Sequence, residues 1–557
     1  MDIYLKDYAY LGDNVLAIGE ALRHTNNGDT LHLGGGVIEL TNTYAVGKNY
    51  YYPRYEDETK FYAIYVENKD NITIDGDGAK LMMIGDVSPF GVEDCSNIKI
   101  CNLSIDYKTP HFWQAEITEV CDNYLEVEYD KDKFPCQYDA KTKTFRFGTD
   151  GDCWYGSSLL ANEFEIDKKR KSPTSPDYFL CLEKPHKVYD FMSSVVDTEV
   201  VGENKFRFNY VTNPEKPRRH KVGNMLVIGC HERKNANMQF HKCKNITVND
   251  VDMYASGSFG ILCVLCENIT LNRYNCRMEE NSDRMLAVHA DNFHCCNCRG
   301  HIEVNDCVFE NSLDDSINVH TKFAVVKSQI NKNTLLIHFT YLAKRALNLF
   351  SPGERISVLD DKSFAEKKML TVKRCDEVGQ YHLRIEFEED VDEIASGMLL
   401  MSEDAKPTMH ISGCKSGNGR GRGFIVTNGN KTLIEDCVFY THGSAIRANG
   451  AGKSYLEGRG INGLTIRNCD FTHAGYCGTS TIQFYPSDLE KFEEYINNDI
   501  LIENNKFIYD VETIFLIRSA KNVAIRDNKY YTSDGKEIDA TDLNDKIQLE
   551  FCENINY

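Results

Sequence analysis

Long apolar runs are missing from this chain of 557 residues, and so is any excess of positive charge. The apolar runs fall well short of the roughly 20 residues that cross a bilayer, which argues against a membrane-spanning helix. The first residues, Met1-Asp2-Ile3-Tyr4, lack the basic and apolar segments of a secretory signal. We therefore expect a cytoplasmic protein that makes no use of a membrane, with secretion left open if a leader has been trimmed.

The shortage of positive charge also limits the partners. Lysine and arginine together number 63 against 84 aspartates and glutamates, which gives a formal net charge of −21. A long-range field of this sign repels nucleic acid, anionic lipid and polyanionic polysaccharide. We expect a neutral substrate and no nucleic-acid partner.

One short phrase with the alternation of a β-strand occurs nine times along the chain. Each copy has an aliphatic or β-branched residue, a spacer and a second aliphatic residue, followed by polar residues and another inward side chain. Alternate side chains of a strand point to one face, so the phrase predicts a strand with one buried face. The copies begin at Ile72, Ile98, Ile246, Ile269, Ile302, Thr432, Leu464, Ile500 and Val523.

The spacing of the copies predicts how the strands stack. Ile269 follows Ile246 at the same interval at which Asn528 follows Asn505, and a longer interval separates Ile302 from Ile269. Both intervals lie within the range of roughly 20 to 50 residues that is typical of solenoids, in which each turn buries its apolar face only against its neighbours. Because no helical pattern lies between the copies, we predict a parallel β-helix, an all-β fold.

The N-terminal segment has the features of a cap on such a solenoid. Residues 13–22 combine a capping aspartate with apolar positions at helical spacing, and Gly28-Asp29-Thr30 then begins a strand. A helix followed by this strand resembles the cap of the pectin-lyase-like right-handed β-helices, where it covers the open edge of the first turn. The resemblance implies a right-handed solenoid whose cap and first coils occupy residues 1–108.

Two stretches interrupt the repeat and are predicted to be inserted domains. The phrase vanishes over residues 109–224 and again over 323–404, and short alternating segments replace it. We interpret both stretches as antiparallel β insertions, small barrels or sandwiches that rise from solenoid loops. The central coils would then occupy residues 225–322 and the C-terminal coils 405–557.

The chain has 21 cysteines, a number that can indicate disulfides. Cys307, Cys437 and Cys469 occupy the same inward position of their repeats, where stacked thiols act as small apolar groups. We therefore predict reduced, structural cysteines. The segment 294–298, His-Cys-Cys-Asn-Cys, has the residue types of a zinc site, but we identify no second cysteine pair at zinc spacing and expect no metal.

The chemistry is predicted to lie in two neighbouring turns of the solenoid. Asp291 precedes Asp314 by the same interval that separates Ile246 from Ile269, one regular turn, and Asp315 follows directly. Equivalent positions of successive turns stack roughly 4.8 Å apart, so three carboxylates would converge on one face. Adjacent residues of a regular strand point to opposite faces, so a bulge or turn is required at 314–315.

Three crowded carboxylates suit the hydrolysis of a glycosidic bond. Like charges raise at least one pKa and leave a protonated acid beside ionised partners. One group can then protonate the leaving oxygen while another activates water. We expect Asp314 to be the general acid and Asp291 and Asp315 to hold and deprotonate the water, with no cofactor.

The glycine-rich segment 417–423 has the composition of a phosphate loop. It leads into a strand at 424–426 and not into a helix, so no helix N-terminus is available to a phosphate. We interpret its glycines as a requirement of tight turns and close backbone packing.

The carboxylate segments resemble known enzymes. An aspartate one turn before an adjacent aspartate pair is similar to the inverting β-helix glycosidases, including the polygalacturonases. The fuller match is to glycoside hydrolase family 110, the α-1,3-galactosidases, which also have β-barrel insertions, and the likeness covers the whole chain. The residues that support this resemblance are Ala290-Asp291-x-x-His294, Asn297-Cys298-Arg299-Gly300, Asp314-Asp315-x-Ile317-Asn318-x-His320, Arg422-Gly423 and Tyr455-Leu456-Glu457-Gly458.

The resemblance to family 110 implies an exo-acting, inverting hydrolysis of terminal α-1,3-linked galactose from Galα1-3Gal, with blood group B-type glycans as further candidates. It places His294, Asn318, His320, Arg422 and Glu457 against a galactose-terminated oligosaccharide. Tolerance of a fucose branch is left open. The oligomeric state is also open, with a homodimer as one alternative.

Two other functions stay open from the sequence. A polygalacturonase-like hydrolase would need basic side chains near the carboxylates to recognise uronates, and we find no Arg-x-Lys tripeptide in the solenoid turns after the aspartate pair. A non-catalytic carbohydrate-binding β-helix or adhesin would not need three aspartates in register. Release of galactose from Galα1-3Gal, compared with cleavage of oligogalacturonate, separates the three functions.

Overall fold

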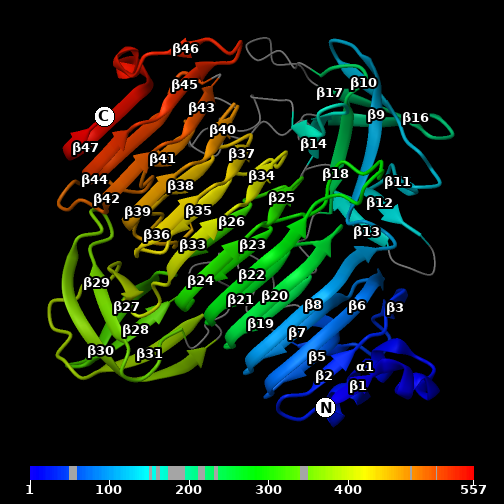
Figure 1. The fold of residues 1–557 in the computed structure, drawn as a ribbon, viewed down its shortest axis with the longest axis horizontal. Helices are drawn as coiled ribbons and strands as arrows, with labels where there is room; N and C mark the ends of the chain where they lie inside the picture. Colours follow the sequence, from blue (N-terminus) through cyan, green and yellow to red (C-terminus); the bar gives the residue numbers. More distant parts are fainter. Residues whose placement is uncertain are drawn as a thin grey trace.

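The structure, a computed structural model, describes residues 1–48, 59–142, 144–149, 154–158, 163–173, 195–210, 220–230, 236–338, 349–379, 381–453, 455–476, 480–509 and 511–557. Parallel strands stack into one long solenoid that runs diagonally across the molecule from the N-terminus to the C-terminus (Figure 1). The predicted all-β parallel β-helix is therefore confirmed. Within the described ranges, no helix has both the length and the apolar character needed to cross a membrane.

The predicted cap is helix α1 (Asn14–His24). Asp13 caps its N-terminus, because the aspartate side chain accepts hydrogen bonds from the backbone amides of Val15 and Leu16. The apolar face of α1, including Ile18, packs into the core of the solenoid. The helix therefore covers the first turn, as the sequence predicts.

The repeated phrase forms one ladder of the solenoid. Ile246 lies opposite Ile98 on one side and Ile269 on the other, so the phrases stack in register. Strand β33 (Thr408–Ser412) adds a turn that we did not predict, with Met409 opposite Ile302. The sequence search missed this turn because a methionine stands where the other copies have a β-branched or aliphatic residue.

A second ladder lies beside the candidate site. The part of this ladder around the site consists of strands of three or four residues each, and every residue in them is buried. We name the segments 285–292, 311–316 and 418–423, which precede three of these strands, the site turns. In ladder order the strands are β19 (Met238–His241), β21 (Ile261–Val264), β23 (Phe293–Cys296), β26 (Ile317–His320), β35 (Phe424–Thr427), β38 (Ile446–Ala448) and β41 (Ile482–Phe484).

The first insertion is a seven-stranded antiparallel sheet accompanied by a three-stranded sheet, at the upper right of Figure 1. It begins with β9 (Phe112–Val120) and ends with β18 (Met225–Gly229). The predicted boundary at residue 224 is wrong, because β18 pairs with β9 and with β14 (Glu163–Asp167) and so belongs to the insertion.

The second insertion is a closed six-stranded barrel, at the lower left of Figure 1. It runs from β27 (Ala324–Asn331) to β32 (Leu399–Ser402), inside the predicted range 323–404. Its apolar core extends onto the outer face of the solenoid and includes Leu262 and Ala290. The core of the first insertion likewise includes Leu313 of a site turn.

The stacked cysteines are free thiols, as predicted, and they bond to the backbone. The Sγ atom of Cys414 donates to the carbonyl oxygen of Val304 at 3.6 Å, and that of Cys437 donates to the carbonyl oxygen of Ile411 at 3.9 Å. Each thiol therefore acts as a weak donor to the preceding turn of the solenoid. Cys414 belongs to the turn that the repeat search missed.

Candidate active site

The parallel register decides which site residues stack. Phe293 lies opposite Ile317, and Ile317 opposite Phe424. Two residues earlier in each turn, Asp291 therefore lies opposite Asp315, and Asp315 lies opposite Arg422. The predicted stacking of Asp291 on Asp314 is wrong by one residue, because this turn of the solenoid is longer by one residue than the turn from Ile246 to Ile269.

The aspartate pair lies in a turn, as the prediction required. Residues 311–316 form bends between strands, and Ser312 Oγ donates a hydrogen bond to the carbonyl oxygen of Asp314 at 2.8 Å. One carboxylate oxygen from each of Asp291, Asp314 and Asp315 lies within 4.8 Å of the other two. The irregular backbone thus brings both members of the pair to the same side as Asp291.

Arg422 holds Asp315 by three hydrogen bonds. Its Nε and Nη2 atoms donate to the two carboxylate oxygens at 2.7 and 3.0 Å, and its backbone amide donates at 2.9 Å. Burial raises the pKa of Asp315 to about 6, and the neighbouring Asp314 and Asp291 add to this rise while Arg422 opposes it. Burial disfavours the cation of Arg422, but Asp315 raises the pKa of the guanidinium overall.

Gly421 allows the third site turn to approach the aspartate pair. A Cβ atom at this position would lie 2.3 Å from the carbonyl carbon of Asp314 and 2.7 Å from the amide nitrogen of Asp315. A Cβ atom on Gly423 would lie 2.2 Å from the carbonyl oxygen of Ala445. The glycines of 417–423 therefore serve close backbone packing, as predicted.

Two buried histidines connect Asp291 to Glu457. The Nδ1 atom of His294 lies 2.7 Å from Asp291 Oδ2, and its Nε2 atom lies 3.1 Å from His320 Nε2. The latter atom lies 3.8 Å from Glu457 Oε1. The Phe259 ring packs against His294 with centroids 4.9 Å apart. A continuous set of polar contacts therefore leads from the carboxylates to the segment of Glu457.

The remaining predicted residue, Asn318, lies opposite His294 in the ladder. It is buried, and its side-chain oxygen accepts no hydrogen bond from the residues that the structure describes. The predicted site residues therefore lie together on three consecutive turns, with the segment of Glu457 placed against them.

Sequence reasoning missed two residues of this site, Phe259 and Lys322. Lys322 is buried, its Nζ donates to the carbonyl oxygen of Tyr455 at 2.9 Å, and an antiparallel bridge joins it to Glu457. It therefore fixes the Glu457 segment. Lys322 stands two residues after His320, and Phe259 stands one turn before Asp291. Each position is a signal in the sequence that could have identified the residue.

The premise of the sequence argument against a metal, that no second cysteine pair exists at zinc spacing, was wrong. Cys263 and Cys266 form a second pair, and Cys263 lies opposite Cys295. The thiols of Cys266 and Cys298 nevertheless donate to backbone carbonyl oxygens of the preceding turn, at 3.4 and 3.6 Å. Because these are the contacts that Cys414 makes elsewhere in the solenoid, we interpret both pairs as structural.

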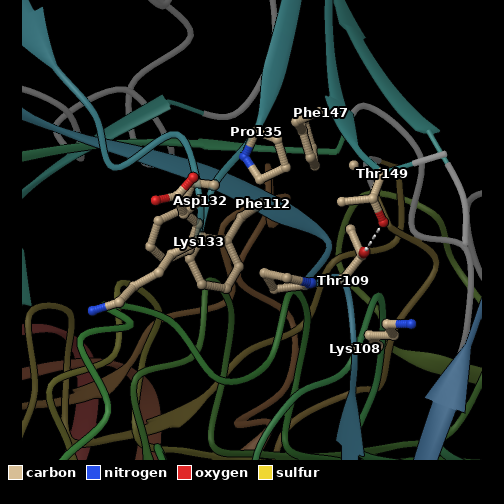
Figure 2. Close-up of a pocket in the computed structure, with 11 residues that line it drawn as sticks. Lys108, Thr109, Phe112, Asp132, Lys133, Pro135, Phe147 and Thr149 are labelled. Atoms are coloured by element: carbon tan, nitrogen blue, oxygen red, sulfur yellow. Dashed lines mark hydrogen bonds between the residues drawn. The ribbon is translucent and has the colours of Figure 1, made fainter. Parts of the chain in front are cut away.

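A cavity of about 210 Å³ lies apart from the carboxylates, at the base of the first insertion (Figure 2). Its walls include the rings of Phe112 and Phe147, and Thr109 and Thr149 share a hydrogen bond of 3.5 Å across it. The charged end of Lys133 points out of the cavity and pairs with Asp283. None of the predicted site residues lines this cavity, so the candidate chemistry stays with the aspartates.

A parallel β-helix that gathers three carboxylates on neighbouring turns has the kind of site that carboxylate-dependent glycosidases use. The chain is 24% identical to the alpha-1,3-galactosidase B of Bacteroides thetaiotaomicron over 92% of its own length and 84% of that protein. It is 26% identical to the alpha-1,3-galactosidase A of the same organism over 90% of its length and 84% of that protein. The predicted resemblance to the α-1,3-galactosidases of glycoside hydrolase family 110 is confirmed.

Other comparisons add little. No family model matches the chain. The family 28 exopolygalacturonase of Yersinia enterocolitica aligns with all of this chain and 78% of its own, at 10% identity and a TM-score of 0.40. This similarity is too low to support any argument about function.

Proposed function

We propose that this protein is an exo-acting, inverting α-galactosidase that removes terminal α-1,3-linked galactose, as in Galα1-3Gal. The observation that carries the proposal is the cluster of Asp291, Asp314 and Asp315, each of which has one carboxylate oxygen within 4.8 Å of one oxygen of the other two. The cluster supplies the chemistry of glycoside hydrolysis, and the similarity to named α-1,3-galactosidases supplies the sugar and the linkage.

Asp314 is the general acid in this proposal. Its side chain is 18% exposed, whereas Asp315 is 2% exposed and accepts three hydrogen bonds from Arg422. A proton donor must reach the leaving oxygen, so the exposed carboxyl is the better placed one. The carboxylates of Asp291 and Asp315 favour a proton on Asp314, whereas Arg422, 3.6 Å away, opposes it.

Asp291 and Asp315 hold and deprotonate the attacking water. The guanidinium of Arg422 favours the ionised form of Asp315, which a base requires. Asn318 lies opposite His294 in the ladder, and Arg422 and Glu457 line the same site. Inversion is proposed from the family resemblance alone.

The proposal is tested by incubating the protein with Galα1-3Gal and recording proton NMR spectra from the first turnovers. We expect free galactose, with the β-anomer first. Galα1-4Gal and oligogalacturonate are the matched control substrates. Cleavage of oligogalacturonate without release of galactose would favour a polygalacturonase-like enzyme, and early α-galactose would show retention.

Activity is expected to fall as the pH drops below about 6. Asp315 has a pKa raised to about 6 by burial, so it is ionised above that pH and loses its basic form below it. The logarithm of kcat/KM on Galα1-3Gal should decline by about one per pH unit on this limb. An acid limb near pH 4, the range of an ordinary carboxyl, would contradict the assignment.

Hydrolysis is expected to survive chelation. The carboxylates provide both the proton and the base, so the chemistry needs no Lewis acid. Activity measured after dialysis against EDTA should equal that of the untreated protein. Loss of turnover that one divalent ion restores would overturn this expectation.

A further inference from the structure

His294 and His320 form a buried pair that the proposed chemistry does not use directly. The two residues are 3% and 2% exposed, so a sugar has little access to either ring. One nitrogen of His294 contacts the base Asp291, and the other contacts His320. His320 is therefore linked to the carboxylate of Asp291 only through His294.

The contacts of His320 determine which nitrogens of the two rings are protonated. His320 Nδ1 is 3.3 Å from the carbonyl oxygen of Thr321, which can only accept, so Nδ1 bears a proton. Burial lowers the pKa of His320 to about 4, so this ring is neutral and its Nε2 is an acceptor. The 3.1 Å contact between the two Nε2 atoms then requires a proton on His294 Nε2.

A further proton lies in the 2.7 Å contact between His294 Nδ1 and Asp291 Oδ2. An imidazole has an ordinary pKa of about 6.5 and an aspartate one of about 3.9, so the ring is the more basic partner. We therefore assign the proton to His294, as an imidazolium beside an ionised Asp291. These positions are assigned from the hydrogen-bond partners together with the relative basicity of the groups.

We propose that His294 and His320 are positioning residues for Asp291. The imidazolium of His294 holds the carboxylate ionised and oriented, and His320 accepts the second N–H that keeps His294 in this state. The inference rests on the proposed function for the role of Asp291 as a base, but the protonation of His294 does not depend on it.

The neighbouring charges agree with this arrangement. Glu457 favours a proton on His320, whereas His294 and Lys322 disfavour one, so the charges around the outer ring partly cancel. Asp291 then has His294 as its cation, and Asp315 has Arg422. Asp314, 3.6 Å from Arg422, lies beside both ion pairs.

The test compares two replacements of His320. Leucine removes the acceptor, whereas glutamine keeps one in its side-chain oxygen. We expect His320→Leu to lower kcat roughly 10- to 100-fold, the value of a hydrogen bond to a charged group, with KM changed less than about twofold. The acid limb of its pH profile should move to higher pH. His320→Gln should restore most of kcat and return the acid limb to its original pH. His301→Leu, at an exposed ring on another face of the solenoid, is the matched control.

The second measurement needs no turnover. Spectra of ¹⁵N-labelled histidine rings at pH 7 should include the signal of a ring with both nitrogens protonated that His294→Asn removes. The proposal is overturned if His294 is neutral, if the Leu and Gln variants behave alike, or if only KM or the melting temperature changes. A wild-type protein that releases no galactose would overturn the proposed function, while the ring spectrum would still decide the state of His294.

Discussion

Replacing Asp314 by Asn is expected to lower kcat on Galα1-3Gal by about 10²- to 10⁴-fold, the usual contribution of a general acid. Hydrolysis of dinitrophenyl α-galactoside should stay close to that of the unmodified protein, because this leaving group departs without protonation. The two substrates need the same base and the same sugar contacts. The ratio of their rates therefore isolates the proton that Asp314 donates.

Asp291→Asn and Asp315→Asn are the controls for this experiment. Each removes a proposed base, so both substrates should lose their turnover. If Asp315→Asn spared the activated substrate and Asp314→Asn did not, the acid would be Asp315, whose pKa near 6 makes it the alternative donor. Proton NMR after short incubation gives the rates for the disaccharide, and absorbance gives those for the aryl galactoside.

Replacing Arg422 by Met is expected to have the second large effect, on stability and on pH dependence together. Arg422 is the cation that holds the buried carboxylate of Asp315, and breaking such a pair from one side costs about 3–5 kcal/mol of unfolding free energy. Without the guanidinium, which lowers the pKa of Asp315, that pKa should rise above 6. The acid limb of kcat/KM should then move toward neutral pH.

The double variant Arg422→Met, Asp315→Asn separates the two effects. Removing both charges leaves no isolated carboxylate in the interior, so most of the lost unfolding free energy should return while activity does not. Urea unfolding and pH profiles provide the measurements. A double variant no more stable than Arg422→Met would show that packing of the long side chain, and not its charge, stabilises the turn.

Much of the fold could be predicted because the solenoid repeats one local pattern. Ile246 and Ile269 stand at equivalent points of the phrase, and they lie opposite each other in the ladder. The same logic located the insertions, where the phrase vanishes. It failed at Met409, since a search for β-branched and aliphatic residues passes over a methionine that fills the same space.

The detailed register could not be read from the average period. A turn as long as the one from Ile246 to Ile269 would place Asp291 on Asp314. The hydrogen-bonded pairs show a turn longer by one residue, which makes Asp315 the neighbour of Asp291. The length of a turn depends on bends outside the strands, which leave no periodic signal. The aspartates themselves could be predicted, because recognising them depends on their residue types and approximate spacing and not on the exact register.

The surroundings of the carboxylates were the least predictable part. Lys322 reaches the site because a bridge joins it to Glu457, which is far away in the chain. The second cysteine pair at Cys263 and Cys266 was overlooked in the sequence although it stands there plainly. Contacts of this kind depend on which segments the fold brings together, and no local pattern encodes them.

The apolar cores of the two insertions include residues of the site turns. This sharing affects how the protein unfolds and which substitutions change its activity. Ala290, next to Asp291, belongs to the core of the barrel, and Leu313, next to Asp314, belongs to that of the first insertion. The three parts are therefore expected to unfold in a single calorimetric transition. A substitution at Leu370, deep in the barrel, can shift the geometry of Asp291 without approaching the sugar. A variant library restricted to residues that touch the substrate would therefore miss some positions that control turnover.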